Sequence, residues 1–380
     1  MAVLAAAPAT GVKRVAVVAS SGRALLQLCG SLLPEIIARR HRVLVVASEF
    51  SNDEMRALDE MGVEYAQFDA EPQGLKLLSD WKAVASLKSV LAAWAPHEVM
   101  GFGAKPMVYA ALAAKGARVD HIVARVDGLP EHGFGGMLAA DEMPAWRYAQ
   151  ALRAAHAAVF HNRDDVGLLK RLGLLPSALP VTIVPGAGID MEQHEKLPLP
   201  SVGQGLIFLM IARLDRRKGV IEYCEAAGKV RERAPNIRFM LAGAAGDGSL
   251  GLHPEDIAEL GPAVEYLGPV DNVRALIAQC HIFVYPSYSE GMPQHVLEAM
   301  AAGRAVITTD VSGCRDTVDE RVNGCLVPAR DTEALAEAME SFLKRPDLIP
   351  TIARASRAKA ERFCGDQLVN QSLLTVLGLE

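Results

Sequence analysis

Short apolar runs alternate with longer amphipathic stretches along the first half of the chain. The strand-like runs include VKRVAVVAS, HRVLVVAS, HEVMGFG and HIVARVDG, and helix-like stretches separate them at 24–40, 75–94, 106–115 and 141–155. Runs of Val, Ile and Ala with few polar interruptions are typical of strands buried on both faces, as in a parallel sheet. The alternation therefore predicts a doubly wound α/β domain.

A break divides the chain near its middle. Residues 194–205, HEKLPLPSVGQG, contain two prolines and two glycines, a composition typical of a linker. Beyond it the alternation restarts with GLIFLMIAR, IRFMLAG, HIFVYPS and RAVITTD. We therefore predict two Rossmann-like domains, 1–195 and 200–364, facing a central cleft. A last helix within 365–380 could pack back onto the first domain.

Composition and charge narrow the class of protein. The chain has 380 residues, of which 51% are hydrophobic and 22% charged, which is enough apolar material for two cores and unlike a disordered chain. The net charge is -6, and residues 1–190 hold as many basic as acidic residues, so the deficit lies in the second half. Duplex nucleic acid requires a basic footprint, so no nucleic-acid partner is expected.

The cysteines, the metal-ligand residue types and the apolar runs together predict an intracellular protein without a resident metal or cofactor. The six cysteines are scattered without a CxxC pair, which fits a reducing cytosol better than a disulfide or zinc site. No DxD triad or His/Asp cluster stands out as a metal site. No apolar run reaches the ~18 residues needed to span a bilayer. The expected location is cytoplasmic.

Two glutamates, Glu290 and Glu298, lie around a predicted helix start in SEGMPQHVLEAMAAGRAV, residues 289–306. Pro293 and Gly303 frame this helix, since proline favours the first helical position and glycine the residue after the end. Glu298 then lies about 7.5 Å along the axis, and the two carboxylates roughly 10 Å or more apart. Glycosidase pairs are about 5 to 9.5 Å apart, which disfavours a hydrolytic pair. Solvated surface charge is the simpler alternative.

Both motifs of the second domain follow predicted strands and suit one long ligand. The amides of Gly291, Met292 and the first helical turn attract anions. In IARLDRRKG, residues 211–219, Arg213 and Lys218 can hold a diphosphate and stabilise it as a leaving group. Two carboxylates flanking an anion-binding helix start match a nucleotide sugar.

The charged residues between Arg213 and Lys218 are weaker evidence of a binding site. Asp215, Arg216 and Arg217 are expected to be solvated loop charges. A loop cluster of Arg and Lys is by itself weak evidence of a site. Its weight comes from the acidic, helix-initiating loop expected on the same edge of the sheet.

Together these motifs resemble a known family. Arg213–x4–Lys218, then Glu290–x7–Glu298 and GRAVITTDVSGCRDTVDERVNGCLVP, resemble the nucleotide-sugar half of the retaining glycosyltransferases of family four, which have the GT-B fold. The subgroup most resembled builds lipid-linked oligosaccharides for bacterial polysaccharides or glycans. Residues 103–130 and 181–190 carry a softer resemblance to it. The family implies transfer of a sugar from a nucleoside-diphosphate sugar, with UDP as the expected nucleotide, to a lipid-linked or saccharide acceptor.

The resemblance also implies roles for single residues. The donor would be bound by seven residues of the second domain: Arg213, Lys218, Glu290, Gly291, Met292, Pro293 and Glu298. Arg213 and Lys218 would bind the diphosphate. Glu290 would hold a sugar hydroxyl, and Glu298 the ribose hydroxyls. The diphosphate would leave without a metal, and the anomeric configuration would be retained.

The first domain departs from the family pattern. Family members often have a histidine after the strand that is HIVARV here, whereas this chain has Asp127, with His132 shortly after. We count Asp127 with Glu290, Arg213 and Lys218 as the candidate catalytic residues. Trapping a glycosyl-enzyme adduct on Asp127 would contradict metal-free attack from the leaving-group face.

Other enzyme classes remain as alternatives. The glycine-rich stretches 101–106, 185–190 and 241–248 lack the GxGxxG context of a dinucleotide site and are typical of tight turns, which disfavours an NAD-dependent oxidoreductase. A nucleotide-sugar epimerase or hydrolase on the same fold would act without an acceptor. A catalytically inactive sugar-nucleotide sensor would bind the donor without turnover.

Two segments of the first domain are candidates for the acceptor side. Residues 34–42, PEIIARRHR, hold three arginines and a histidine beside an apolar pair, which suits peripheral contact with the anionic inner membrane. An ordinary helix end with basic residues would have the same sequence. SSGR, residues 20–23, follows the first strand and is an acceptor-side loop by position alone.

Overall fold

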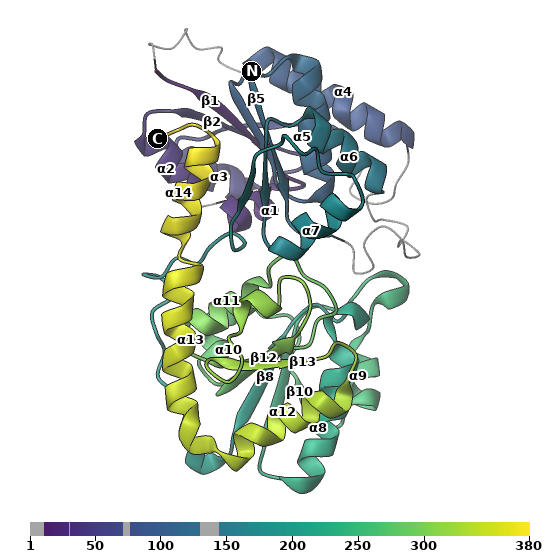
Figure 1. The fold of residues 1–380 in the computed structure, drawn as a ribbon, viewed down its shortest axis with the longest axis vertical. Coiled ribbons are helices and arrows are strands. Elements are labelled where there is room, and N and C mark those ends of the chain that lie inside the picture. Colours follow the sequence, from purple (N-terminus) through teal and green to yellow (C-terminus); the bar gives the residue numbers. More distant parts are fainter. Residues whose placement is uncertain (1–10, 30, 71–76, 130–143) are drawn as a thin grey trace. The chain divides into compact units, whose positions relative to one another are not determined.

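The computed structural model describes residues 11–29, 31–70, 77–129 and 144–380. The chain divides into two compact units (Figure 1). The first comprises Met1–Ala187 with Gln367–Glu380, and the second comprises Gly188–Asp366.

The first unit is built on a seven-stranded sheet of order β3-β2-β1-β4-β5-β6-β7, in which every described pairing is parallel. Its strands are β1 (Arg14–Val18), β2 (Arg42–Ala47), β3 (Glu64–Gln67), β4 (Glu98–Gly101), β5 (His121–Val126), β6 (Ala157–Phe160) and β7 (Val181–Ile183). Its helices are α1 (Gly22–Cys29), α2 (Leu32–Ala38), α3 (Asn52–Glu60), α4 (Leu77–Trp94), α5 (Ala104–Ala117), α6 (Ala145–Ala154), α7 (Arg163–Arg171) and α14 (Asp366–Val376).

The second unit has a six-stranded parallel sheet of order β10-β9-β8-β11-β12-β13. Its strands are β8 (Ile207–Ile211), β9 (Arg238–Ala242), β10 (Val264–Tyr266), β11 (Ile282–Tyr285), β12 (Ala305–Thr309) and β13 (Gly324–Val327). Its α-helices are α8 (Val220–Arg233), α9 (Pro254–Leu260), α10 (Val273–Ile277), α11 (Gln294–Ala301), α12 (Thr332–Lys344) and α13 (Ile349–Phe363). Short 3-10 turns include η2 (Arg216–Lys218).

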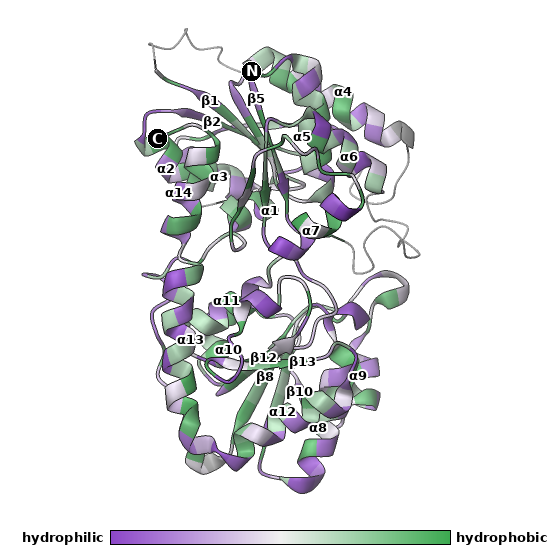
Figure 2. Cartoon of the chain, in the orientation of Figure 1, coloured by the Kyte–Doolittle hydropathy of each residue, from purple (hydrophilic) through white to green (hydrophobic). Residues whose placement is uncertain are grey.

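Alternation along β1 shows why the sheet of the first unit is buried on both faces. Ala16 and Val18 belong to a core formed with α4, α5, α6 and α7, whereas Val15 and Val17 belong to a second core formed with α1, α2 and α14. Successive side chains of a strand point to opposite faces, so apolar residues at every position require helices on both sides. Figure 2 shows hydrophobic strands inside each unit and polar outer helix faces. The predicted two-domain parallel α/β architecture is confirmed.

The last helix packs on the first unit. Val369 and Leu373 of α14 lie in the same core as Leu33 of α2, and Asn370 Nδ2 donates to Glu35 Oε1 at 2.9 Å. Figure 1 shows α14 in yellow beside α2. The chain therefore leaves the first unit and returns to it at its end.

The division between the units lies earlier than the linker composition predicts. The segment 194–205 belongs to the second unit, because the buried Arg304 donates to the carbonyls of Leu197 and Pro198 at 3.2 and 2.8 Å. Ile189 N also donates to Cys364 O at 2.7 Å. The boundaries expected at 195 and 200 therefore move to Ala187 and Gly188. Proline-rich composition marks a segment without regular structure, and this one is held by backbone hydrogen bonds.

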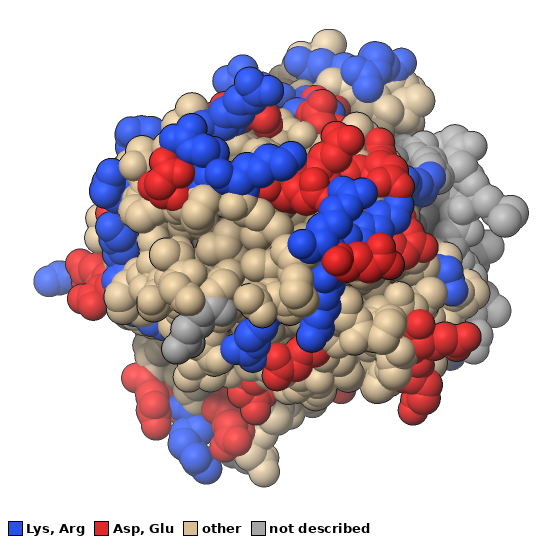
Figure 3. All heavy atoms as spheres, turned by 90° about the horizontal axis from the view of Figure 1, so that it is seen from below, with Lys and Arg blue, Asp and Glu red and all other residues tan. Residues whose placement is uncertain are grey.

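Charged side chains of both signs lie on the surface beside uncharged areas. On the face shown in Figure 3, Lys and Arg side chains are interspersed with Asp and Glu side chains. In the second unit, Lys229 pairs with Glu333 and Arg233 pairs with Glu340, which joins α8 to α12. Exposed pairs of this kind contribute little to stability, about 0 to 1 kcal/mol each.

Candidate active site

Strands β8 and β11 are neighbours at the centre of the second sheet, although β9 and β10 separate them in the chain. They pair over only two positions, Phe208 with Ile282 and Leu209 with Phe283. The strand order reverses here, and ligands of open α/β sheets bind beyond the carboxyl ends of the strands at such a point. The loops after β8 and β11 contain both predicted donor motifs.

A close approach of backbones joins the two loops. Gly219 has φ of 73°, and a Cβ at this position would lie 2.1 Å from Pro286 O, so only glycine fits. Beside it, Arg217 O accepts a hydrogen bond from Tyr288 N at 2.9 Å. These contacts place Lys218 directly against the loop that contains Glu290.

Lys218 and Glu290 form an ion pair in this structure. Lys218 Nζ donates to Glu290 Oε1 at 2.5 Å, and Tyr285 Oη and Ser287 Oγ donate to the same oxygen at 2.9 and 2.8 Å. Burial, reinforced by the charge of Glu290, raises the pKa of Tyr285 well above its usual range, so this phenol remains a donor. None of the hydrogen bonds made by the described residues reaches Oε2 of Glu290.

Arg213 has a different environment. It follows β8 directly and is exposed. Its guanidinium makes no hydrogen bond or ion pair with any residue that the structure describes. Of the two predicted diphosphate ligands, Arg213 thus has its full charge available, whereas the charge of Lys218 is compensated by Glu290.

The loop charges between these cations are not all solvated. Asp215 is buried, and its Oδ1 accepts from Arg217 N at 2.8 Å and Nε at 3.0 Å. Burial alone would raise the pKa of Asp215, but the hydrogen bonds and charge of Arg217 outweigh it, so the pKa is lowered. The expectation of a solvated Asp215 is wrong, because this carboxylate caps the turn η2 that carries Lys218.

Helix α11 begins after Pro293, which is its N-cap residue, and ends before Gly303, whose φ is 72°. Glu298 lies on its partly exposed side, with Oε2 2.9 Å from His295 Nδ1. His295 lies one helical turn before Glu298, the residue predicted to bind the ribose, and the two side chains are therefore neighbours.

The residues before α11 are closely packed. Gly291, Met292 and Pro293 are buried. Glu290 N donates to Ser312 O at 3.3 Å, and a Cβ on Gly313 would lie 2.4 Å from Glu290 O. The loop after β12 therefore supports the backbone of the glutamate loop from behind.

In the first unit, Asp127 belongs to a cluster of charged and polar groups at the carboxyl ends of β5 and β6. Its Oδ1 lies 2.8 Å from Arg125 Nε and 3.2 Å from His161 Nε2, and its Oδ2 accepts from Gly103 N at 2.6 Å. Burial would raise the pKa of Asp127, but Arg125, His161 and the Gly103 amide together lower it to about 2. Asp127 is therefore ionised throughout the neutral range.

The sequence did not single out Arg125 and His161 as site residues. Arg125 is fully buried, its guanidinium lies 4.2 Å from the centre of the Phe102 ring, and its Nη1 has no hydrogen-bond partner. Burial lowers the pKa of His161 despite the opposing effect of Asp127. A charged residue within an otherwise apolar strand, HIVARV, is the signal that could have marked Arg125.

Proton position decides the bonding of His161. Arg125 Nη2 lies 3.0 Å from His161 Nε2 and can only donate, so that bond requires an unprotonated Nε2. Asp127 Oδ1 lies 3.2 Å from the same nitrogen but has no hydrogen-bond partner among the described residues. His132, the other first-domain candidate, lies outside the described residues.

The basic segment 34–42 is partly neutralised within its own unit. Arg39 Nη1 pairs with Glu35 at 3.2 Å, and Arg42 Nη2 pairs with Glu64 at 2.6 Å. The Arg42 guanidinium also lies 5.7 Å from the centre of the Trp94 ring. Only part of the positive charge seen in the sequence is thus left for an anionic surface.

The described residues contain neither a membrane-spanning helix nor a group of metal-ligand side chains. None of the helices in the described ranges is both long and apolar enough to cross a bilayer. Among the same residues, His, Cys, Asp and Glu side chains form no group of three or more that could hold a metal ion.

Family models match both units of the chain. Residues 22–187 match the glycosyl transferase 4-like domain, and residues 205–345 match glycosyl transferases group 1. The chain is a glycosyltransferase, with a glycosyl transferase 4-like first unit and a group 1 second unit. The expected enzyme class, a glycosyltransferase, is thereby confirmed.

Bacterial relatives agree with this assignment. An N,N'-diacetylbacillosaminyl-diphospho-undecaprenol alpha-1,3-N-acetylgalactosaminyltransferase of Campylobacter jejuni is 24% identical over 365 residues, which cover 92% of this chain and 94% of that protein. The amylovoran biosynthesis glycosyltransferase AmsK of Erwinia amylovora is 26% identical over 200 residues, 50% of this chain and 49% of that protein. This glycosyltransferase thus matches the first relative over nearly its whole length and the second over about half.

Solved structures establish the fold. Alr3699/HepE of Anabaena, in complex with UDP and glucose, superposes with a TM-score of 0.74 at 19% identity, covering 96% of this chain and 99% of that chain. Sucrose-phosphate synthase of Thermosynechococcus elongatus gives a TM-score of 0.77 at 19% identity, with 96% and 98% covered. The GT-B fold expected for this glycosyltransferase is therefore confirmed.

Proposed function

We propose that this glycosyltransferase transfers a sugar from a UDP-sugar to a hydroxyl of a lipid-linked saccharide in bacterial glycan assembly, with retention of configuration. The lipid-linked acceptor is supported by the Campylobacter jejuni relative, whose name specifies a diphospho-undecaprenol substrate. The nucleotide is supported by the HepE complex, which contains UDP and glucose.

The observation that carries the proposal is the arrangement of Arg213, Lys218 and Glu290 at the β8–β11 switch point. Among the described residues, the Arg213 guanidinium has no ionic partner. On the same edge of the sheet, the Lys218 ammonium pairs with one oxygen of Glu290. A diphosphate would bind Arg213, and it would compete with Glu290 for hydrogen bonds from the Lys218 ammonium. The second oxygen of Glu290 would accept a hydrogen bond from a hydroxyl of the donor sugar.

Other donor contacts follow from the same loops. The amides of Gly291 and Met292 would lie near the sugar and phosphate, beside Pro293, which has no N–H to donate. Glu298 would accept hydrogen bonds from the ribose hydroxyls, with His295 orienting its carboxylate. A helix start that supplies backbone N–H groups favours a bound anion.

The bond between the anomeric carbon and the diphosphate oxygen breaks in this reaction. The acceptor hydroxyl forms the new bond on the same face, and its proton passes to the departing diphosphate. Arg213 and Lys218 would stabilise the charge of that leaving group. Asp127, with a pKa of about 2, is a weak base and would act as a fixed negative charge in the first unit.

A two-stage experiment tests this proposal. Thermal unfolding is measured with UDP-, GDP- and ADP-sugars, because a ligand that binds only the folded state raises Tm. The stabilising donor is then incubated with a polyprenyl-diphosphate saccharide, and the new linkage is identified by NMR. We expect stabilisation by UDP-sugars and a product with the donor's anomeric configuration.

Other outcomes would replace the proposal. An inverted linkage would contradict retention, and a larger shift with GDP- or ADP-sugars would contradict the choice of UDP. Conversion of the donor without any acceptor would favour an epimerase or hydrolase. Donor binding without turnover across an acceptor panel would favour a sugar-nucleotide sensor. A lipid-linked acceptor also implies peripheral contact with the cytoplasmic face of the inner membrane, which vesicle co-sedimentation tests.

A further inference from the structure

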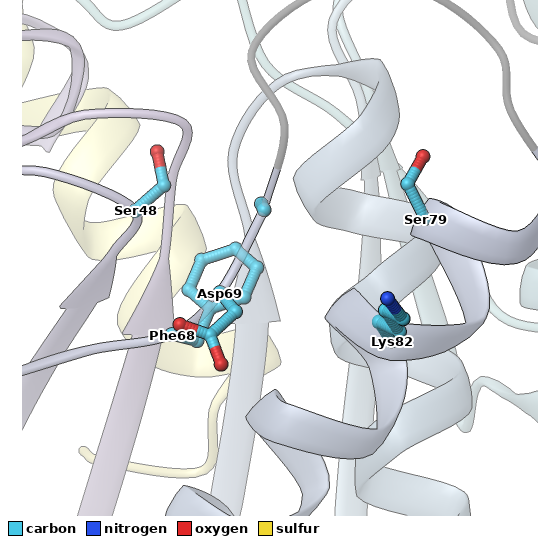
Figure 4. Close-up of a pocket in the computed structure, with 6 residues that line it drawn as sticks. Ser48, Phe68, Asp69, Ser79 and Lys82 are labelled. Atoms are coloured by element: carbon cyan, nitrogen blue, oxygen red, sulfur yellow. The ribbon is translucent and has the colours of Figure 1, made fainter.

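A cavity of about 280 Å³ opens in the first unit. It is lined by Ser48, Phe68, Asp69, Ala70, Ser79 and Lys82. Figure 4 shows Ser48, Phe68 and Asp69 on one side of it and Ser79 and Lys82 of α4 on the other. Small-molecule sites have volumes of about 300 to 1,000 Å³, so this one suits a single group the size of a monosaccharide.

The position of the cavity follows from the sheet. Ser48 comes directly after β2, and Phe68 and Asp69 come directly after β3, so the cavity lies at the carboxyl edge where open α/β sheets bind ligands. Ser48 Oγ donates to Ser20 O at 2.5 Å, which links it to the loop after β1. The loop 20–23, expected from its position to face the acceptor, therefore adjoins the cavity.

Opposite charges face the cavity without being paired to each other. Asp69 and Lys82 are both exposed, and neither side chain makes a hydrogen bond or ion pair with any described residue. The Asp69 backbone is fixed, since its N–H donates to Ser86 Oγ of α4 at 3.0 Å. Two charged groups held apart across a cavity with hydroxyls nearby can each bond to a ligand.

This combination favours a neutral sugar over an anion. Asp69 can accept from hydroxyl groups, Lys82 can donate to hydroxyl or acetamido oxygens, and the Ser48 hydroxyl, whose proton goes to Ser20 O, can accept a further hydrogen bond. The Phe68 side chain adds an apolar surface. A phosphate would gain from Lys82 but would be repelled by Asp69, since like charges at close range are unfavourable.

The sheet order also separates this cavity from Asp127. Three strand spacings lie between β2 and β5 and four between β3 and β5. At ~4.8 Å per strand, these correspond to roughly 14 and 19 Å. A sugar in the cavity is therefore remote from groups bound near Asp127, and a ligand that reaches both must be longer than one sugar.

We propose that this cavity binds a neutral sugar of the saccharide acceptor, remote from the hydroxyl that is glycosylated. The inference rests on the proposed function and adds to it that the enzyme recognises acceptor length. Asp69 and Lys82 are the residues that distinguish a long acceptor from a short one.

The test compares two acceptors on one lipid diphosphate, a trisaccharide and a monosaccharide, in the full-length protein. For Asp69→Ala and Lys82→Ala we expect KM for the trisaccharide acceptor to rise about tenfold, with KM for the monosaccharide acceptor and for the donor unchanged within twofold. Lys88→Ala is the matched control, because Lys88 is an exposed lysine of the same helix that does not line the cavity. Equal KM changes for both acceptors, or none, would refute the cavity site.

A binding measurement separates failure of this inference from failure of the proposed function. Saturation-transfer NMR with the methyl glycoside of the trisaccharide needs no turnover. Signal in the wild type that is lost in both cavity variants supports the sugar site even if no donor is found. Signal that persists in the variants refutes it, as does displacement of the trisaccharide from the wild type by millimolar inorganic phosphate.

Discussion

Two ionic clusters, one in each unit, lie at the carboxyl ends of parallel strands and differ in how their charges are held. In the second unit, Lys218 and Glu290 are partly exposed and joined through one carboxylate oxygen, and Arg213 of the same sheet edge pairs with none of the described residues. In the first unit, Arg125 is fully buried, and Asp127 is bound by three neighbours. In the second unit, Arg213 and Glu290 can still bond to a ligand. In the first unit, the neighbours of Asp127 keep its carboxylate charged and fixed in position.

The difference matters because the two clusters would otherwise be given the same role. A carboxylate whose pKa is about 2 exchanges no proton near neutral pH. A guanidinium without a partner is a ready anion site. We therefore assign ligand binding to the second cluster and electrostatic support to the first, and the following predictions test that contrast.

The largest effect is expected from removing either cation of the second unit. Arg213→Ala and Lys218→Ala should each lower kcat by about 10² or more, because each loses charge stabilisation of the leaving diphosphate. Steady-state kinetics with saturating donor measures this. Arg216→Ala is the matched control, since Arg216 is an exposed arginine of the same turn. Unchanged turnover in both variants would remove the diphosphate role.

Asp127→Asn should mainly lower stability. The change leaves the buried Arg125 charge without its partner, which costs roughly 3 kcal/mol. Urea unfolding at pH 7 measures it, with the exposed Asp120→Asn as control. Because folding lowers the pKa of Asp127 from 3.8 to about 2, its contribution is present above pH 4 and is lost as the pH falls toward 2. If the wild-type pH–rate profile contained an ionisation near neutral pH that Asp127→Asn removed, Asp127 would exchange a proton and would not be a fixed charge.

Glu298→Ala should act on donor binding. Loss of the ribose contact should raise the donor KM about tenfold, equivalent to about 1.4 kcal/mol, with kcat nearly unchanged. The exposed Glu337→Ala on α12 should leave both constants as they are. A change confined to kcat would argue against ribose binding.

The smallest effect concerns histidines that occur in both units. His41 Nδ1 accepts from Lys13 N and His281 Nδ1 accepts from Ile207 N, each at 3.1 Å. Burial is the main cause that lowers the pKa of each imidazole below its ordinary 6.5. The bonds are therefore intact above pH 6.5 and are lost as the pH falls below it, because a protonated ring cannot accept.

Asparagine at either position keeps an acceptor and removes the titration. His41→Asn and His281→Asn should each reduce the loss of stability between pH 7 and 5 by on the order of 1 kcal/mol, the net value of one hydrogen bond. Urea unfolding at pH 5, 7 and 8 measures this, with pH 8 as the internal reference. An identical pH slope in wild type and both variants would contradict the role of these rings.

Patterns within short stretches of sequence predicted the secondary structure and the candidate residues of the second unit. Val-rich runs predicted buried parallel strands, and the framing prolines and glycines predicted a helix over 293–302, which the structure has at Gln294–Ala301. The candidate donor-binding residues Arg213, Lys218, Glu290 and Glu298 were predicted from motif spacing. These features depend on a few consecutive residues, so the physical signal is complete within the sequence.

Only the tertiary structure shows which of the residues that are distant in the sequence contact each other. The β8–β11 adjacency, the Lys218–Glu290 ion pair and the approach of His161 to Asp127 all join segments 34 to 74 positions apart. Such contacts depend on strand order and on close backbone approaches such as Gly219 with Pro286, which follow from packing helices on both faces of a sheet. The sequence by itself determined the parts and their chemistry, and packing determined which charges are shared, buried or left available.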